Sequence, residues 1–160
     1  MRKALIQCPL MWELGAFNTV DGVADELVVN HYTGGMSAKK DSSTGPGQIF
    51  AATAIRVLNH AIRQGLIGGT LMDAAKESLW AVWQRLHGDT VYTMSTVPLV
   101  LIEGAHEIGV ARPGLDTAEE DSRRTLARYH GTDVSAQGYG TAQLGLYRVF
   151  EKYHAPLRGQ

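Results

Sequence analysis

Cysteine is nearly absent from this chain of 160 residues, which contains only Cys8. A single thiol excludes an internal disulfide and a cysteine-rich zinc site. The net charge is also small, at −1, because 15 Lys and Arg residues nearly balance 16 Asp and Glu residues. Bulk charge therefore cannot attract a polyanion, and we expect no nucleic-acid partner. The composition, 44% hydrophobic and 19% charged, is that of a chain that buries a core, and the length fits one domain.

Long hydrophobic runs are missing as well. The longest apolar run spans residues 97–102, whereas a transmembrane helix needs about 20 apolar residues. Arg2 and Lys3 precede an apolar stretch that Gln7 and Pro9 interrupt, which is unlike the continuous apolar core of a signal peptide. We expect neither a membrane span nor a signal peptide.

Metal and nucleophile motifs are missing too. The six histidines never pair at i and i+4, and the pair His106-Glu107 lacks the second histidine of a zinc-hydrolase helix. Cys8 has no neighbouring histidine, and the chain has neither a Gly-x-Ser-x-Gly nucleophile turn nor a phosphate-binding loop. We therefore expect no metal and no cofactor, and we assign structural or surface roles to the histidines.

Helical periodicity dominates what is present. Apolar residues recur at i, i+3, i+4 and i+7 from Ala54 to Ile62, and Gly65 ends this helix. A capping-box pattern at Thr70 predicts a second helix from there to Gly88, and the pattern at Thr117 predicts a third that ends near Tyr129.

Four further segments complete the helical pattern. Residues 2–14, about 21–32 and 95–109 have helical composition, and the last helix would carry one apolar face from Tyr139 to Tyr153. Pro9 predicts a kink or a late start in the first of these, and residues 91–93 could form a short strand. The fold class is therefore mainly α, with at most a minor β element.

Three separated segments of the sequence contain the candidate catalytic and ligand-binding residues. Glu13 follows an apolar stretch that would raise the pKa of its carboxyl group, as a general acid requires. The polar loop 33–48 ends in Ser43, Gly47 and Gln48, whose backbone and amide suit a polar ligand such as a sugar. Tyr129 lies at a predicted helix end.

These pieces resemble, in the same order, the motifs of the lysozyme superfamily, including goose-type lysozymes and lytic transglycosylases. The resemblance rests on Glu13, on Gly45-Pro46-Gly47-Gln48-Ile49 followed by Thr53-Ala54, and on Tyr129-His130-Gly131 followed by Tyr139. It implies a single lysozyme-like catalytic domain over residues 1–160, either complete or a fragment of a longer protein. It also implies a glycosidase (muramidase) that cleaves the β-1,4 bonds of bacterial peptidoglycan between N-acetylmuramic acid and N-acetylglucosamine.

The resemblance also implies roles for individual residues. Glu13 would be the general acid, and Asp41 would position or activate water. Ser43, Gly47, Gln48, Tyr129 and Tyr139 would bind the glycan. The partner would be the peptidoglycan strand, reached in the periplasm or outside the cell after lysis or delivery, with a delivery module or an inhibitor protein as further partners.

Several alternatives stay open. Glu26 competes with Glu13 as the acid, and Asp21 and Asp25 compete with Asp41 as the second group. The reaction could instead be that of a lytic transglycosylase, which works with one carboxyl group. A catalytically inactive glycan-binding domain and an unrelated helical interaction module are the other two interpretations.

We expect Trp80 and Trp83 to belong to the core rather than to a sugar-stacking platform.

Overall fold

The computed structural model describes residues 1–16 and 19–159, and these residues form an almost purely helical protein. Over this part of the chain there are seven α-helices, a short terminal 3-10 helix and no β-strand. One isolated antiparallel bridge joins Thr44 to Ile49. The predicted fold class, mainly α with at most a minor β element, is confirmed.

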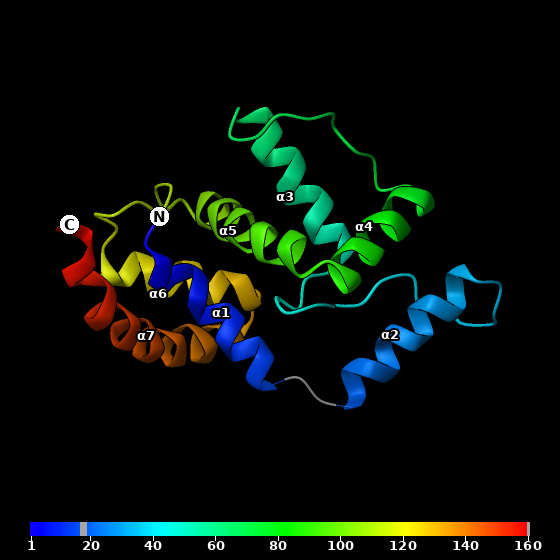
Figure 1. Ribbon diagram of the computed structural model, residues 1–160, viewed down its shortest axis with the longest axis horizontal. Coiled ribbons are helices and arrows are strands. Elements are labelled where there is room, and N and C mark those ends of the chain that lie inside the picture. The colour runs from blue at the N-terminus through cyan, green and yellow to red at the C-terminus, as the bar shows by residue number, and fades with distance from the viewer. Residues whose placement is uncertain (17–18, 160) are drawn as a thin grey trace. The chain divides into compact units, whose positions relative to one another are not determined.

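The helices follow one another in the order shown in Figure 1. Their bounds are α1 (Lys3–Ala16), α2 (Thr19–Tyr32), α3 (Ala51–Arg63), α4 (Lys76–Gly88), α5 (Thr90–Glu107), α6 (Glu119–His130), α7 (Val134–His154) and the 3-10 helix η1 (Ala155–Gly159). All seven predicted helical segments are therefore helices.

Contacts within the chain group these helices into two compact units. One consists of Met1–Trp12 together with Val100–Gln160, and the other is Glu13–Leu99. The divisions fall inside α1 and α5. The single domain expected from chain length stays a prediction.

In the unit Glu13–Leu99, α3 packs against α4. The buried side chains of α3 include Ala54, Val57 and Ala61, which are three members of the predicted apolar stripe. A long connection, residues 64–75, leaves the end of α3 and returns to the start of α4 (Figure 1). Asn59 holds this connection, because its side-chain amide exchanges hydrogen bonds of 2.7 and 2.9 Å with the backbone of Met72.

Two predicted helix starts are wrong. The helix α4 begins at Lys76 rather than at Thr70, because Asp73 accepts hydrogen bonds from Ala75 N and Ser78 Oγ in a turn of its own. The helix α6 begins at Glu119, and the hydroxyl of Thr117 accepts the backbone N–H of Gly114 instead of capping the helix. Polar side chains satisfied within a loop are no longer available as caps.

The possible short strand is corrected, and one of the two alternatives for Pro9, a late helix start, is excluded. Residues 91–93, considered as a short strand, belong to α5, which starts at Thr90. The first helix does not start late, since α1 runs from Lys3 to Ala16 with a buried Pro9 inside it.

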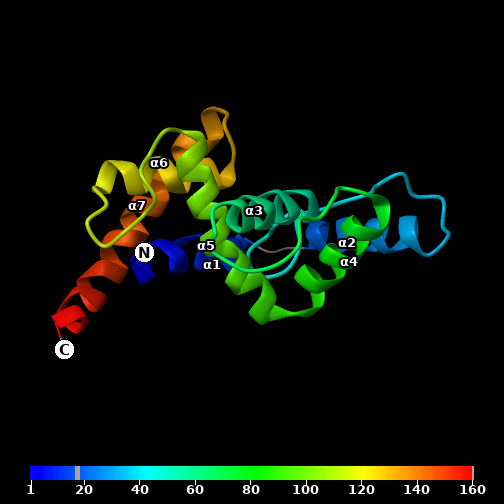
Figure 2. The same ribbon diagram turned by 90° about the horizontal axis from the view of Figure 1, so that it is seen from above.

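In the other unit, α6 and α7 lie side by side in both ribbon views (Figures 1 and 2). They approach closely at Gly140, where a Cβ would overlap Ala127 and the carbonyl oxygen of Arg123. The predicted apolar face of α7 is wrong in part, because Tyr153 is 67% exposed. The buried side combines small and polar residues with two aromatics, and it is made of Ala136, Tyr139, Gly140, Gln143 and Tyr147.

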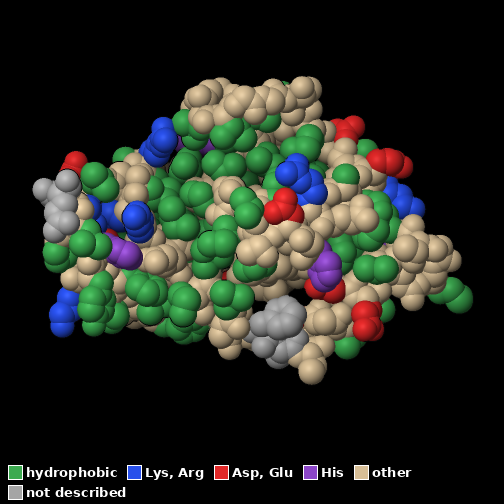
Figure 3. All heavy atoms as spheres, in the orientation of Figure 1, with side chains coloured by type: hydrophobic (Ala, Val, Ile, Leu, Met, Phe, Trp, Pro, Cys, Tyr) green, Lys and Arg blue, Asp and Glu red, His purple; other side chains and the backbone are tan. Residues whose placement is uncertain are grey.

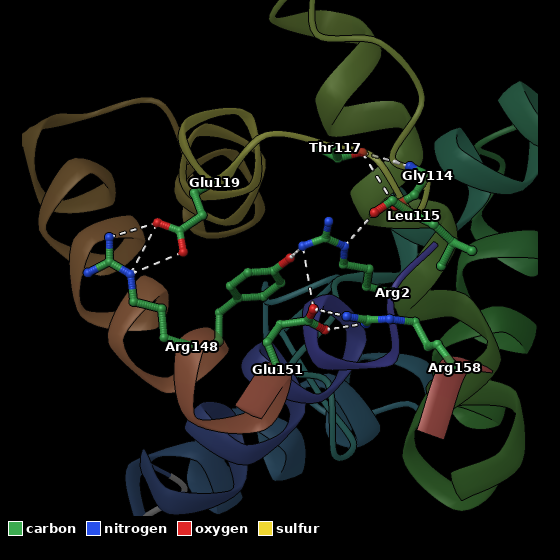
Figure 4. Close-up of polar contacts among 9 residues, drawn as sticks. Arg2, Gly114, Leu115, Thr117, Glu119, Arg148, Glu151 and Arg158 are labelled. Carbon is green, nitrogen blue, oxygen red and sulfur yellow. Dashed lines mark hydrogen bonds and ion pairs between the residues drawn. The ribbon is translucent and has the colours of Figure 1, made fainter. Parts of the chain in front are cut away.

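Arg2 links the start of this unit to its end (Figure 4). Its guanidinium donates to the carbonyl oxygen of Leu115 at 2.6 Å and to the hydroxyl of Tyr147 at 2.7 Å. It also pairs with Glu151, which Arg158 contacts from the other side. These bonds fasten the N-terminal segment to α7 within the same unit.

The surface carries no large region of one charge on the face shown in Figure 3. Basic and acidic side chains are scattered there among broader areas of hydrophobic side chains. Among the described residues, no helix is long and apolar enough to cross a membrane.

Candidate functional site

The best-organised polar cluster surrounds Asp25 in α2, inside the unit Glu13–Leu99. Asp25 is 7% exposed. Its Oδ1 accepts a hydrogen bond of 2.8 Å from Ser42 Oγ, and its Oδ2 accepts one of 3.0 Å from Thr44 Oγ1. Both hydroxyls are themselves buried. A buried carboxylate needs such donors, because each replaces water lost on folding.

His87, at the end of α4, completes the cluster. Its Nδ1 lies 3.3 Å from Asp25 Oδ2 and 3.0 Å from Thr44 Oγ1. The imidazole is stacked on the indole of Trp83 with 4.9 Å between ring centroids and 11° between planes. Trp83 Nε1 donates to Ser42 Oγ at 3.2 Å, which returns the network to Asp25. The polar contacts at Nδ1 and the stacking on Trp83 together therefore fix the position of the imidazole.

A cavity of about 670 Å³ opens beside this cluster. One face of α2 forms most of its wall, because the residues at 22, 25, 26, 29 and 30 recur at helical spacing, and Thr33 follows directly after the helix. The lining residues are Gly22, Asp25, Glu26, Val29, Asn30, Thr33, Gly34, Gly35 and His87. Its volume is within the range of about 300 to 1,000 Å³ that is usual for ligand pockets.

Three aromatic rings continue the stack away from His87. Trp83 is stacked on Trp80 at 5.6 Å, and Trp80 on Tyr32 at 4.7 Å between centroids. Trp83 is buried and Trp80 is half-buried. The prediction that both tryptophans are core residues is thus confirmed for Trp83 and met in part for Trp80. The rings stiffen the wall that carries His87.

The predicted sugar-binding loop forms a tight turn in the same unit. Thr44 and Ile49 exchange two backbone hydrogen bonds of 3.2 Å, and the backbone between them has positive φ at Gly45 (67°) and Gln48 (46°). The side chain of Gln48 accepts from Ser43 Oγ at 3.1 Å and donates to the Gly45 carbonyl at 3.1 Å. Both the oxygen and the nitrogen of the Gln48 side-chain amide therefore stabilise the turn. The oxygen can accept one further hydrogen bond, and the nitrogen can donate one more.

Asp41 holds the start of α3. Its two carboxylate oxygens accept hydrogen bonds from the backbone N–H groups of Ala51 and Ala52, at 3.0 and 2.9 Å. Burial raises the pKa of the Asp41 carboxyl above its ordinary value, although the bonds from Ala52 and Ala51 work in the opposite direction. Asp41 is not among the residues that line the cavity. Its predicted role in positioning water stays a prediction.

The two candidate acids lie in different places. Glu13 is half-buried near the end of α1, and its neighbours Trp12 and Leu14 are 40% and 55% exposed. Glu13 is not among the cavity residues, whereas Glu26 is exposed in α2 and lines the cavity next to Asp25. Of the two candidate acids, only Glu26 therefore lines this cavity, and of the candidates for the second group Asp25 lines it whereas Asp41 does not.

The two predicted tyrosines belong to the other unit. Tyr139 is 6% exposed, with its ring stacked on His130 at 4.5 Å and in an edge contact with Trp12 at 5.6 Å. Tyr129 is half-buried near the end of α6. Ser43, Gly47 and Gln48 share the turn described above, and the tyrosines share the α6 and α7 region of their own unit.

His87 is the residue that sequence reasoning missed. It was assigned a structural or surface role because no partner lies near it in the chain, and its contacts come from residues 43 and 62 positions earlier. The sequence did contain one indication of a polar surface on the helix that faces His87. Gly22, Asp25, Glu26 and Val29 share one helical face, which carries small and acidic residues and a single valine.

Within residues 1–16 and 19–159, no group of three or more histidine, cysteine, aspartate or glutamate side chains is placed to hold a metal ion. Comparison with protein-family models, curated proteins and solved structures finds no match for this chain.

Proposed function

We propose that this protein is a glycosidase that cleaves the β-1,4 bonds of bacterial peptidoglycan between N-acetylmuramic acid and N-acetylglucosamine. The observation that carries the proposal is the cavity beside α2, which is lined by the carboxyl-bearing residues Asp25 and Glu26 and by His87. A glycosidic bond is cleaved by an acid that protonates the leaving oxygen and, in hydrolysis, by a second group that assists water. The cavity holds candidates for both tasks.

The lining of the cavity also suits a sugar. Asn30 and Thr33 supply hydrogen-bonding groups, and Val29 supplies an apolar contact. Glycines at 22 and 34 leave room for a ligand to approach the backbone, whereas the side chain of Asn30 fills the space beside Gly35. Sugars need this mixture, because their hydroxyls form hydrogen bonds while the C–H faces of the ring pack on apolar groups.

The acid is proposed to be one of two glutamates. Glu13 is supported by the resemblance to the lysozyme superfamily, and Glu26 is supported by its place in the cavity lining. The turn that carries Ser43, Gly47 and Gln48 would contribute hydrogen bonds to the glycan, and Asp41 would hold that turn at the start of α3. Tyr129 and Tyr139 remain proposed glycan contacts on the basis of the resemblance.

The experiment is digestion of purified cell walls, followed as loss of turbidity. Glu13→Gln and Glu26→Gln each remove one acid while preserving side-chain size, and Glu77→Gln, at an exposed position of α4, is the matched control. Loss of a general acid is expected to reduce the rate by about 10² to 10⁴. Whichever glutamate causes this loss, with the fold intact by circular dichroism, is the acid.

Mass spectrometry of the released fragments then identifies the reaction. Hydrolysis leaves a reducing end, whereas a lytic transglycosylase leaves a 1,6-anhydro end. Binding to walls without any released fragment would contradict the proposal and favour a catalytically inactive glycan-binding domain. Neither binding nor cleavage would favour a helical interaction module.

The proposed function also requires that the protein reach the bacterial cell wall. The protein would act in the periplasm or outside the cell, after lysis or with the help of a delivery module, and an inhibitor protein would be a natural further partner. Its near-zero net charge supplies little attraction to an anionic wall, so adhesion would have to come from the cavity or from that partner.

A further inference from the structure

We infer that His87, oriented by Asp25, is the base that removes a proton from the attacking water during glycan hydrolysis. This inference rests on the proposed function and deepens it, because it assigns the second group of the reaction to a residue for which the sequence indicated only a structural or surface role. It is carried by the hydrogen-bond chain from His87 through Thr44 to Asp25 at the wall of the cavity.

The hydrogen bonds determine which nitrogen carries the proton. The hydroxyl of Thr44 donates its one hydrogen to Asp25 Oδ2 at 3.0 Å, so toward His87 its oxygen acts as an acceptor. His87 Nδ1, which also lies 3.3 Å from Asp25 Oδ2, must therefore be the N–H donor. The neutral imidazole then carries its lone pair on Nε2, the form in which that atom can accept a proton.

The imidazole is also held rigidly while remaining open to water. Its ring lies on Trp83, which is 1% exposed and is itself bonded to Ser42. The side chain of His87 is nevertheless 52% exposed and lines the cavity. A base needs this combination, because a fixed ring lowers the cost of alignment and an exposed edge admits the water.

Asp25 has the complementary role of a positioning residue. Its carboxylate is 11% exposed at the side chain and accepts from Ser42, Thr44 and, at a longer distance, His87. Through Thr44 and through this contact, Asp25 fixes the orientation of the imidazole. The other ionisable residues that line the cavity with His87 are Asp25 and Glu26, both from α2, and the loop contributes the hydroxyl of Thr44 to the ring.

A nucleophilic role for Thr44 does not fit the same contacts. In a hydroxyl–histidine–carboxylate triad, the hydroxyl and the carboxylate bind opposite nitrogens of the imidazole. Here Thr44 and Asp25 both face Nδ1, and Thr44 is completely buried. Thr44 therefore orients the histidine rather than attacking the substrate.

The reaction balances with groups of the chain and one water molecule. His87 Nε2 takes a proton from water as the water oxygen bonds to the anomeric carbon. The bond between that carbon and the glycosidic oxygen breaks, and the oxygen takes the proton of the acidic glutamate. The imidazolium then releases its proton to solvent and the glutamate regains one. Attack on the face opposite to the leaving group inverts the anomeric configuration.

Asp41 is the competing base, since the sequence pointed to it. Both of its oxygens hold α3, and it is not among the residues that line the cavity. The comparison of His87→Ala with Asp41→Asn therefore separates the two assignments.

The test uses cell-wall digestion with added imidazole. His87→Ala is expected to lower the rate by about 10² or more, and free imidazole at millimolar concentrations should restore a large part of it by entering the vacated space. His106→Ala, an exposed histidine of α5 in the other unit, is the matched control and should keep full activity without responding to imidazole. Full activity in His87→Ala, or loss without rescue in a folded variant, would overturn the inference.

A second measurement does not depend on activity. Nitrogen-15 NMR of the wild-type protein should show His87 with its proton on Nδ1 at neutral pH, and Asp25→Asn should weaken that preference. A proton on Nε2 would overturn the inference even if the protein cleaves walls. Absence of wall cleavage by the wild type would instead contradict the proposed function, and a 1,6-anhydro product would remove the need for a water-activating base.

Discussion

Gly45 lies directly against the backbone carbonyl of Leu86, in the turn that the sequence singled out for ligand binding. A Cβ at this position would overlap the carbonyl oxygen and would lie 3.0 Å from Thr93 Oγ1. The φ of Gly45 is +67°, in the left-handed region. Glycine is thus required here for two separate reasons, backbone conformation and space.

Substitution Gly45→Ala should therefore destabilise the fold strongly. The matched control is Gly65→Ala, because Gly65 has almost the same φ, +65°, with nothing within 4 Å of an added Cβ. We expect about 1 kcal/mol of lost stability for the control, from backbone strain alone, and at least about 2 kcal/mol more for Gly45→Ala. Urea unfolding measures both, and equal losses would show that Leu86 does not confine the turn.

Asp41→Ala should weaken the start of α3. The two backbone N–H groups of Ala51 and Ala52 would lose their protein acceptor, and loss of a helix cap costs about 1 kcal/mol. Asp116→Ala, at an exposed loop position of the other unit, should change stability little. Thermal unfolding of the three proteins provides the comparison, and an unchanged midpoint for Asp41→Ala would contradict the capping role.

Asn59→Ala should release the connection between α3 and α4. It removes two hydrogen bonds with the backbone of Met72, and each net bond contributes about 1 kcal/mol. Asn59→Asp is the graded variant, because it keeps an acceptor for Met72 N but loses the donor to Met72 O. We expect hydrogen exchange over residues 66–75 to accelerate in both variants, and more in Asn59→Ala.

Cys8 should be unreactive in the folded protein. Burial, and to a lesser extent the charge of Glu151, raises the pKa of the Cys8 thiol to about 12, so the thiolate is scarce at neutral pH. Iodoacetamide should therefore label the native protein far more slowly than the protein unfolded in urea. Equal labelling rates would show that the thiol is accessible.

The same shift predicts a pH dependence of stability. The unfolded chain ionises its thiol near pH 9, whereas the folded protein resists ionisation up to about pH 12. The contribution of Cys8 is therefore complete below about pH 9 and is lost as the pH rises toward 12. Comparison of wild type with Cys8→Ala across this interval isolates it from other groups, and parallel stability curves would contradict it.

Local sequence patterns predicted the helices well and their starts less well. The stripe Ala54, Val57 and Ala61 is buried as its spacing requires, because a helix must place residues three and four apart on one side. The starts near Thr70 and Thr117 were wrong, because each of these patterns can also be satisfied inside a loop. The packed face of α7 was predicted wrongly because the prediction counted apolar side chains. Gly140 has no side chain, yet it allows close approach to α6.

The amino-acid sequence by itself determined that the chain is helical, has a net charge of only −1 and forms no internal disulfide, and it identified the polar loop 33–48 as a candidate ligand-binding segment. These properties follow from composition and short-range spacing. Only the tertiary structure decided that His87 meets Asp25 and Thr44, residues 62 and 43 positions away, at the wall of a cavity. The physical reason is that hydrogen bonds between distant segments depend on how helices pack, and no local pattern encodes that packing.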